Sequence, residues 1–187
     1  MNNNNDLELI KATLRGDRGS FAAMVEKYKD MVFNLAYRMT GKLADAEDLT
    51  QEIFLKVYRK LSKFDLSREF GPWIYTVSVN ACNTYFRRKR YLVISLSQPK
   101  QLEDGEIYPE IGSDAENPER ELAKKDGQAR VQKIISSLPV RFRAIFILRY
   151  IENKQYREIA EIANLPLGTV KTYLFRGQKL LAEKLKE

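Results

Sequence analysis

The C-terminal part of the chain carries side chains that suit contact with DNA. At the helical period, residues 168–181 collect cations, a hydroxyl and one aromatic ring on a single side, here called the basic strip: Lys171, Thr172, Phe175, Arg176 and Lys179. The opposite side is an apolar stripe: Val170, Leu174, Gly177 and Leu181. In a major groove, lysine and arginine reach phosphates or guanine edges, threonine pairs with several bases, and a phenyl ring contacts a thymine methyl. The pattern predicts a helix with one buried face and one DNA-binding face.

A second helix is predicted just ahead of this one, over residues 155–163. The turn Asn164-Leu165-Pro166 separates the two, as in a helix-turn-helix. An amphipathic hairpin with a merely solvated basic face would show the same periodicity. The ring of Phe175 and the charge of residues 126–187, which hold 12 basic and 6 acidic side chains, favour the DNA-binding interpretation.

A second basic run, Arg87-Arg88-Lys89-Arg90, ends a helix predicted over residues 72–90. Aromatic and amide groups ahead of such a run can stack on the bases of a single strand while the cations bind its phosphates. Trp73 and Val77 of this helix are expected in the core. Asn80 is expected to be functional, because an amide beside a core stripe needs a hydrogen-bond partner.

Charge is distributed in three blocks along the 187 residues, whose net charge is +7. Residues 1–96 hold 16 basic and 11 acidic side chains, whereas residues 97–125 hold 4 and 8. Residues 103–119 contain seven acids and no base, with glycines and prolines between them, which is a linker composition. The linker is expected to be a solvated tether or, alternatively, a nucleic-acid mimic that occupies a basic channel.

The composition excludes several kinds of site. The chain has no histidine and a single cysteine, Cys82, so it lacks the usual general base, a His/Cys zinc site and an internal disulfide. Cys82 is expected to be a small core residue. The N-terminal sequence lacks a signal-peptide pattern and no apolar run approaches the roughly 18 residues that span a bilayer. The protein is expected in the cytoplasm, without a cofactor or metal.

Helical periodicity covers nearly all of the chain outside the linker, so the predicted fold class is all-α. Ser20 is the predicted N-cap of a long helix that Gly41 ends, and Gly16 is predicted to close the helix before it. The predicted helices cover residues 6–15, 20–39, 45–63, 72–90, 128–138, 140–151, 155–163 and 168–184.

Three segments, in this order and spacing, resemble the extracytoplasmic-function (ECF) sigma factors of bacterial RNA polymerase: DAEDLTQEIFLKVYRKLSKFD, FGPWIYTVSVNACNTYFRRKR and YREIAEIANLPLGTVKTYLFRGQKLL. The resemblance implies two small helical domains joined by an acidic flexible linker. The first is a sigma-two-like four-helix domain over residues 1–92, which binds core polymerase and melts the −10 promoter element. The linker covers residues 93–125. The second, over residues 126–187, is a sigma-four-like helix-turn-helix domain that reads the −35 element.

The resemblance also assigns roles to residues. Four would face the clamp of the polymerase: Asp48, Gln51, Glu52 and Leu55. On the helical wheel Leu55 is an exposed leucine ringed by charge, which fits a protein-contact anchor. A base flipped from the −10 element would be surrounded by the loop of residues 65–69 and by Lys56, Lys60, Phe64 and Asn80. Adjacent phosphates would be held by Arg87, Arg88 and Arg90, and the −35 duplex by the basic strip with Thr169.

Members of this family are usually held inactive by an anti-sigma factor, often membrane-anchored, until a stress signal arrives. The resemblance therefore implies core RNA polymerase, promoter DNA and an anti-sigma factor as partners. A stand-alone helix-turn-helix repressor or activator is the alternative. It would leave the surface around Leu55 and the second basic run without a role. An enzyme acting on nucleic acid is disfavoured, because the sequence has no P-loop and no metal-ligand cluster.

Overall fold

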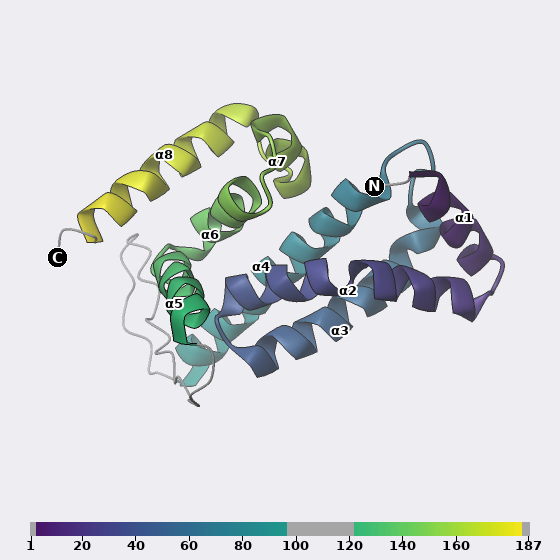
Figure 1. Cartoon of the computed structure of the whole chain (residues 1–187), viewed down its shortest axis with the longest axis horizontal. Coiled ribbons are helices and arrows are strands. Elements are labelled where there is room, and N and C mark those ends of the chain that lie inside the picture. Colours follow the sequence, from purple (N-terminus) through teal and green to yellow (C-terminus); the bar gives the residue numbers. More distant parts are fainter. Residues whose placement is uncertain (1–2, 97–121, 185–187) are drawn as a thin grey trace.

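The computed structural model of the protein is helical and describes residues 3–96 and 122–184. The N-terminal half contains α1 (Asn3–Leu14), α2 (Arg18–Thr40), α3 (Leu43–Lys60), the 3₁₀ turn η1 (Leu61–Lys63) and α4 (Phe70–Leu96). The C-terminal half contains α5 (Leu122–Ser136), α6 (Val140–Phe146), the π-helical turn η2 (Ile147–Ile151), α7 (Tyr156–Ala163) and α8 (Leu167–Lys184) (Figure 1). These described residues contain no strand, which confirms the all-α prediction for them. The central part of the predicted linker, residues 97–121, lies outside the described residues.

The ends of the first helices are set by one side chain and two glycines. The carboxylate of Asp17 accepts hydrogen bonds from Gly19 N at 2.9 Å and from the Ser20 hydroxyl at 2.6 Å. The bond from Ser20, followed by that from Gly19, lowers the pKa of Asp17. Asp17 is thus the N-cap of α2, and the prediction of Ser20 is wrong. Gly16 and Gly41 adopt φ of +98° and +72°, a left-handed conformation in which glycine carries no steric penalty.

Other helix boundaries differ by a few residues from the predicted ones. The helix α4 begins at Phe70, so Pro72 lies within its first turn, where the missing N–H has no intrahelical acceptor to lose. The helix α5 begins at Leu122, six residues before its predicted start. The helix predicted over residues 140–151 changes character at Ile147, where the hydrogen bond from Glu152 N to Ile147 O has the five-residue spacing of a π-turn.

The N-terminal half closes around an apolar cluster between its four helices. Its fully buried side chains include Ile10, Met24, Val32, Ile53 and Ile74. A carboxylate is also buried in this half: Asp6 accepts a hydrogen bond from the Tyr28 hydroxyl at 2.7 Å and pairs with Lys27. Burial raises the pKa of Tyr28, so its phenol stays protonated and remains the donor.

In the C-terminal half, α6 and α8 approach each other at a glycine. A Cβ on Gly177 would lie 2.3 Å from Cε2 and 2.9 Å from Cζ of Phe146. Real Cβ atoms do not come that close, so the buried Gly177 permits this helix crossing. Val170 and Leu174 are also buried on the same side of α8, which confirms the predicted apolar stripe.

Gly177→Ala is therefore expected to lower the free energy of unfolding by about 1–3 kcal/mol, because the added methyl displaces the Phe146 ring. The higher helix propensity of alanine, about 1 kcal/mol, offsets only part of this cost. Gly168→Ala is the matched control on the same helix, since no described atom lies within 4 Å of the Cβ it would add. Urea unfolding followed by circular dichroism compares the two variants. Equal stabilities would contradict the predicted clash.

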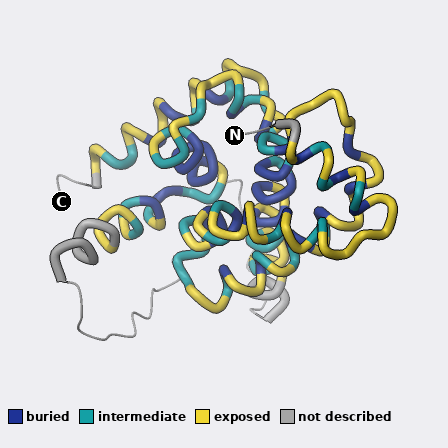
Figure 2. Tube along the Cα trace, turned by 45° about the vertical axis from the view of Figure 1, so that its right-hand side comes forward, coloured by how far each residue is buried: buried dark blue, intermediate teal, exposed yellow. Residues whose placement is uncertain are grey.

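The two halves pack on each other through a second apolar cluster, a possibility that the sequence leaves open. Helix α4 contacts α7 and α6, and α2 contacts α5 and α6. The cluster joins Leu35 and Val79 of the first half to Ile145, Ile159 and other buried residues of the second. Figure 2 shows such buried residues on the inward sides of the helices of both halves.

Polar contacts also cross this interface. The Tyr75 hydroxyl donates a hydrogen bond to Glu152 Oε2 at 2.5 Å, and the Gln132 amide donates to Arg38 O at 3.1 Å. Burial raises the pKa of Tyr75, which keeps its phenol as the donor. Because these partners are far apart in sequence, helical periodicity alone does not predict them.

None of the helices within residues 3–96 and 122–184 is long and apolar enough to cross a membrane.

Candidate nucleic-acid interface

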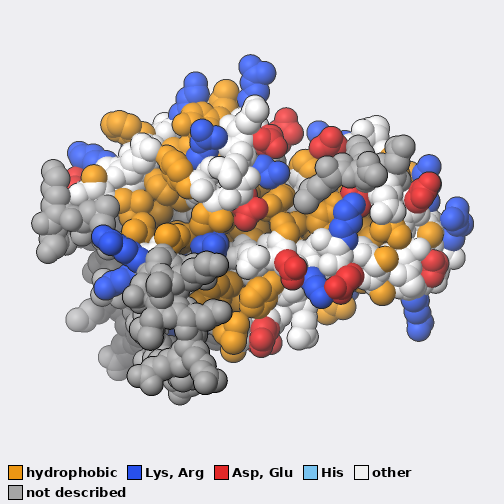
Figure 3. Space-filling view, viewed as in Figure 1, with side chains coloured by type: hydrophobic (Ala, Val, Ile, Leu, Met, Phe, Trp, Pro, Cys, Tyr) orange, Lys and Arg blue, Asp and Glu red, His pale blue; other side chains and the backbone are white. Residues whose placement is uncertain are grey.

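Helix α8 presents the basic strip away from the rest of the molecule. All five residues of the strip are exposed, and the Phe175 side chain reaches 69% exposure. Val170 and Leu174, on the opposite side, are 0% and 3% exposed. Figure 3 shows Lys and Arg side chains projecting along the edge of the molecule that α8 forms. The strip therefore keeps cations and an unshielded ring available to a ligand, whereas the Thr172 hydroxyl donates its proton to Gly168 O at 2.9 Å and can only accept a further hydrogen bond.

The turn ahead of α8 is fixed by backbone hydrogen bonds. Asn164 adopts a left-handed φ of +52°, and Leu165 N donates to Ala160 O at 2.9 Å. Thr169 N and Val170 N then donate to Pro166 O at 2.9 and 3.1 Å. This chain of bonds sets the angle between α7 and α8. The arrangement is the helix-turn-helix that the sequence predicts.

Helix α7 is anchored to the core by two isoleucines. Ile159 and Ile162 are 0% and 1% exposed. Ala160 and Ala163 of the same helix are only half-buried. The N-terminus of α7 is closed by a hydrogen bond from Gln155 N to Glu158 Oε2 at 2.7 Å.

A second basic surface lies across α3 and α4. Arg87, Arg88 and Arg90 are exposed on α4, and Lys60 is exposed at the end of α3. Lys89, between the arginines, is half-buried and lies 3.6 Å from a carboxylate oxygen of Asp45. The three arginines therefore form the solvent-facing part of the run.

Glu52 joins the two predicted surfaces of the N-terminal half. Its Oε1 lies 2.6 Å from Lys56 Nζ and 3.7 Å from Arg88 Nη1. The structure thus brings together a residue predicted for the polymerase and two predicted for the −10 element. Exposed ion pairs of this kind are worth at most about 1 kcal/mol, so a phosphate can replace the carboxylate as the partner of either cation.

The polymerase surface predicted on α3 is available to solvent. Asp48 and Gln51 are exposed, Glu52 is half-buried beneath its ion pairs, and Leu55 is 57% exposed. The position of Leu55 among polar groups agrees with the helical wheel.

Phe64 does not lie along the same edge as Lys56 and Lys60. Lys56 and Lys60 lie four residues apart on one edge of α3, which ends at Lys60. The turn η1 follows with three residues per turn, so this spacing does not continue to Phe64. Phe64 is 7% exposed and packs against Phe70 and Trp73, with ring centroids 5.5 and 5.0 Å away. The expectation that this ring lines an open pocket with the two lysines is therefore corrected: it supports the surface from beneath.

Asn80 is a candidate for a reason other than the predicted one. The side chain of Asn80 is exposed. The prediction that its amide lies beside the core and therefore needs a hydrogen-bond partner is wrong. Val77 is 6% exposed and lies in the core, as predicted, whereas Trp73 is only partly buried. Asn80 consequently has an amide free to meet a ligand from solvent.

The loop between η1 and α4 is ordered by one carboxylate. Asp65 Oδ1 accepts hydrogen bonds from the Ser67 hydroxyl at 2.7 Å and from Ser67 N at 3.0 Å. These two bonds lower the pKa of Asp65. The turn holds residues 65–69 beside the start of α4, where they remain exposed.

The described part of the chain offers neither a metal-binding cluster nor a reactive thiol. Those residues contain no group of three His, Cys, Asp or Glu side chains that could hold a metal ion. Cys82 is fully buried, and that burial raises the pKa of its thiol to about 12. The prediction that Cys82 is a core residue is confirmed.

Sequence reasoning missed Arg141, which lies at the start of α6 and beside α8. Nothing in the periodicity of α6 indicates this neighbourhood, because it depends on how the two helices cross at Gly177. Arg141, Arg176 and Lys179 line a common groove.

Comparisons with known proteins cover both halves. The family model for Sigma-70 region 2 matches residues 24–91, and the model for Sigma-70, region 4 matches residues 128–181. The ECF RNA polymerase sigma factor SigW of Bacillus subtilis is 34% identical over 181 residues, which cover 95% of each chain. The ECF RNA polymerase sigma-E factor of Escherichia coli K12 is 30% identical over 184 residues, 96% of this chain and 94% of that one.

Solved structures show the same fold. CnrH, in complex with the cytosolic domain of CnrY, superposes with a TM-score of 0.65 at 19% identity, covering 97% of both chains. The sigma factor RpoE of Bartonella quintana, in complex with the anti-sigma factor NepR, gives a TM-score of 0.62 at 23% identity, covering 89% of this chain and 96% of that one.

Proposed function

The chain belongs to the ECF sigma factors of RNA polymerase, and on that premise we propose that its described surfaces divide promoter recognition between the two halves. The protein binds core RNA polymerase and directs it to promoters. The observation that carries the proposal is the exposed basic strip on α8, behind a turn that backbone hydrogen bonds fix. A second cationic surface on α3 and α4 supplies the other contact with DNA.

The C-terminal half reads the −35 element through α8. A major groove admits one helix, whose exposed side chains then face the base edges. Lys171, Arg176 and Lys179 contact guanines or phosphates, Thr172 bonds to bases, and Phe175 packs on thymine methyl groups. Thr169, half-buried at the start of α8, contacts the sugar–phosphate backbone of the DNA.

The N-terminal half binds the −10 element as a single strand. Lys56 and Lys60 with the loop of residues 65–69 surround a flipped base, and Asn80 hydrogen-bonds to it. Flipping costs a few kcal/mol, which stacking and phosphate contacts offset. Phosphates on either side are held by exposed arginines: Arg87, Arg88 and Arg90.

The remaining proposals concern partners and place in the cell. Asp48, Gln51, Glu52 and Leu55 dock on the clamp of core polymerase, and the C-terminal half docks on the flap. An anti-sigma factor keeps the protein inactive until a stress signal arrives. The protein acts in the cytoplasm by binding alone and catalyses no reaction of its own. Residues 1–92 and 126–187 are proposed as the two functional domains, with residues 93–125 as the linker between them.

Strand opening tests the function and separates it from the alternative. The full chain is mixed with core RNA polymerase and a library of promoter fragments, and run-off transcripts identify the sequences used. Permanganate reactivity of unpaired thymines then reports opening at the −10 element. A stand-alone repressor or activator would bind the duplex and leave start-site choice and strand pairing unchanged, and that result would overturn the proposal.

Arg176→Ala is expected to weaken binding of a matched promoter by about 1–3 kcal/mol, because the bidentate contact of a guanidinium with a guanine edge or phosphate is lost. Promoter affinity of the reconstituted polymerase is measured by fluorescence anisotropy. Association with core polymerase, measured on the same preparation, is expected to be unchanged. Transcription that is indifferent to the substitution would remove Arg176 from the −35 contact.

A further inference from the structure

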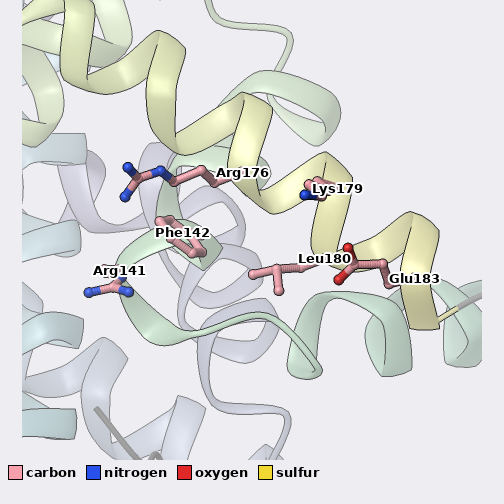
Figure 4. A pocket seen from close by; sticks show the side chains of 6 residues that line it. All are labelled: Arg141, Phe142, Arg176, Lys179, Leu180 and Glu183. Atoms are coloured by element: carbon pink, nitrogen blue, oxygen red, sulfur yellow. The ribbon is translucent and has the colours of Figure 1, made fainter. Parts of the chain in front are cut away.

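A groove runs between the start of α6 and the second half of α8. It encloses about 270 Å³ and is lined by Arg141, Phe142, Arg176, Lys179, Leu180 and Glu183. Figure 4 shows the Arg141 and Arg176 side chains extending from α6 and α8 toward the same end of the groove, with the Phe142 ring between them. Two guanidinium groups from different helices thus flank one opening.

The charge in this groove suits an anion at the arginine end. Three of its six residues are cations. Among the six described residues that line the groove, Glu183 is the only acid, and it lies seven residues beyond Arg176 on α8, about 10 Å along the helix axis. An anion placed between the arginines is therefore well away from the carboxylate.

The start of α6 is rigidly placed relative to α8. Phe142 is 2% exposed and packs edge-on against Tyr173 of α8, with ring centroids 5.1 Å apart. The Arg141 guanidinium lies 4.9 Å from the centroid of the Phe142 ring, a cation–π contact. Since Phe142 is buried against α8, the core places the backbone of its neighbour Arg141 beside the basic strip.

From this juxtaposition, we infer that Arg141 binds a DNA backbone phosphate flanking the −35 element, beside the contacts of α8. The inference rests on the proposed function, because α8 must lie in the major groove. A helix seated there presents its neighbouring elements to the sugar–phosphate backbone at the groove edge. A guanidinium suits that position, since its planar donors bind a phosphate bidentately. The contact fixes the register of the helix and carries no base preference.

The test uses the full chain with Arg141→Gln, bound to core RNA polymerase, and a promoter duplex selected by the wild-type protein. Affinity is measured across a range of salt concentrations. We expect severalfold weaker binding, and a slope of log affinity against log salt that is shallower by about 1, because one phosphate contact is lost. Arg141→Lys, which keeps the charge, is expected to retain the wild-type slope.

A methylphosphonate scan locates the contact. Each duplex carries one neutral methylphosphonate in place of a backbone phosphate near the −35 element. At one position, the wild-type complex is expected to weaken while the Arg141→Gln complex is expected to lose nothing further. Such non-additivity shows that the residue and the phosphate interact.

Lys133→Gln is the matched control, since Lys133 is exposed on α5 and does not line the groove. This variant is expected to keep the wild-type slope, and thermal unfolding checks that Arg141→Gln is folded. A folded Arg141→Gln variant with unchanged affinity and slope, or additive effects at every scanned phosphate, would overturn the inference. Weaker association with core polymerase in place of weaker DNA binding would also overturn it, because the groove would then bind protein.

The Arg176→Ala variant distinguishes failure of the inference about Arg141 from failure of the proposed function. If Arg176→Ala weakens promoter binding and Arg141→Gln does not, only the role of Arg141 is wrong. If neither variant weakens it, α8 does not read the −35 element.

Discussion

Replacing Arg143 with methionine is expected to lower the free energy of unfolding by about 3–5 kcal/mol, because three backbone carbonyls lose their charged hydrogen-bond donor. Arg143 is 9% exposed. Its guanidinium donates hydrogen bonds to Ser136 O at 2.7 Å, to Leu138 O at 3.1 Å and to Met39 O at 2.5 Å. Methionine fills a similar volume but leaves these carbonyls without their donor, and each buried orphan costs about 1–3 kcal/mol.

The position of these carbonyls explains how a guanidinium is tolerated there. Met39 lies in the last turn of α2 and Ser136 is the last residue of α5, so both carbonyls belong to helix C-termini. These ends carry partial negative charge and carbonyls without intrahelical partners. Burial lowers the pKa of Arg143 to about 10, so the group remains charged at neutral pH. Arg143 therefore links the negative ends of two helices, one from each half.

Urea unfolding of the full chain, followed by circular dichroism, measures the effect. Arg143→Lys is expected to recover only part of the loss, because an ammonium cannot reproduce the planar fork of donors. Arg157→Met, at an exposed position on α7, controls for the loss of one positive charge and is expected to change stability by less than about 0.5 kcal/mol. If Arg143→Met were as stable as Arg157→Met, the carbonyl network would not hold the halves together.

The packing of the two halves also shows where sequence reasoning stops. Periodicity predicts which side of a helix is buried, and it does so for Val170 and Leu174 of α8. It does not predict which element covers that side. In the sequence Arg143 is one more cation of a basic block, because its acceptors lie on backbone atoms that only the tertiary fold assembles.

The candidate site was predictable to the extent that it lies within regular helices. The basic strip follows from the period of α8, and its exposure is as expected. The prediction for Phe64 failed at the point where α3 becomes a 3₁₀ turn, since a change of helical type rotates every later side chain. Arg141 was missed because its place beside α8 depends on the close approach at Gly177. A site built from two elements can be predicted only when the tertiary fold is known, whereas a site on one helix can be predicted from helical periodicity alone.

Leu55→Asp is expected to abolish association with core RNA polymerase without unfolding the protein. An apolar anchor at the centre of an interface contributes about 2–4 kcal/mol. A carboxylate buried at the same place without a partner adds a desolvation cost, and the acidic neighbours Asp48 and Glu52 disfavour its burial further. Because Leu55 is 57% exposed in the free protein, the substitution removes little packing. Gel filtration of the variant with core polymerase measures the association.

Leu43→Asp provides the matched control. Leu43 is 58% exposed and opens the same helix, α3, so the control introduces the same charge with the same change in exposed area. An aspartate there is at the N-terminus of the helix, where it interacts favourably with the helix dipole. The control is therefore expected to fold and to bind polymerase as the wild type does. If both variants co-eluted with the polymerase, Leu55 would lie outside the interface; if both failed to do so, the contact would depend on the charge of α3 and not on one apolar anchor.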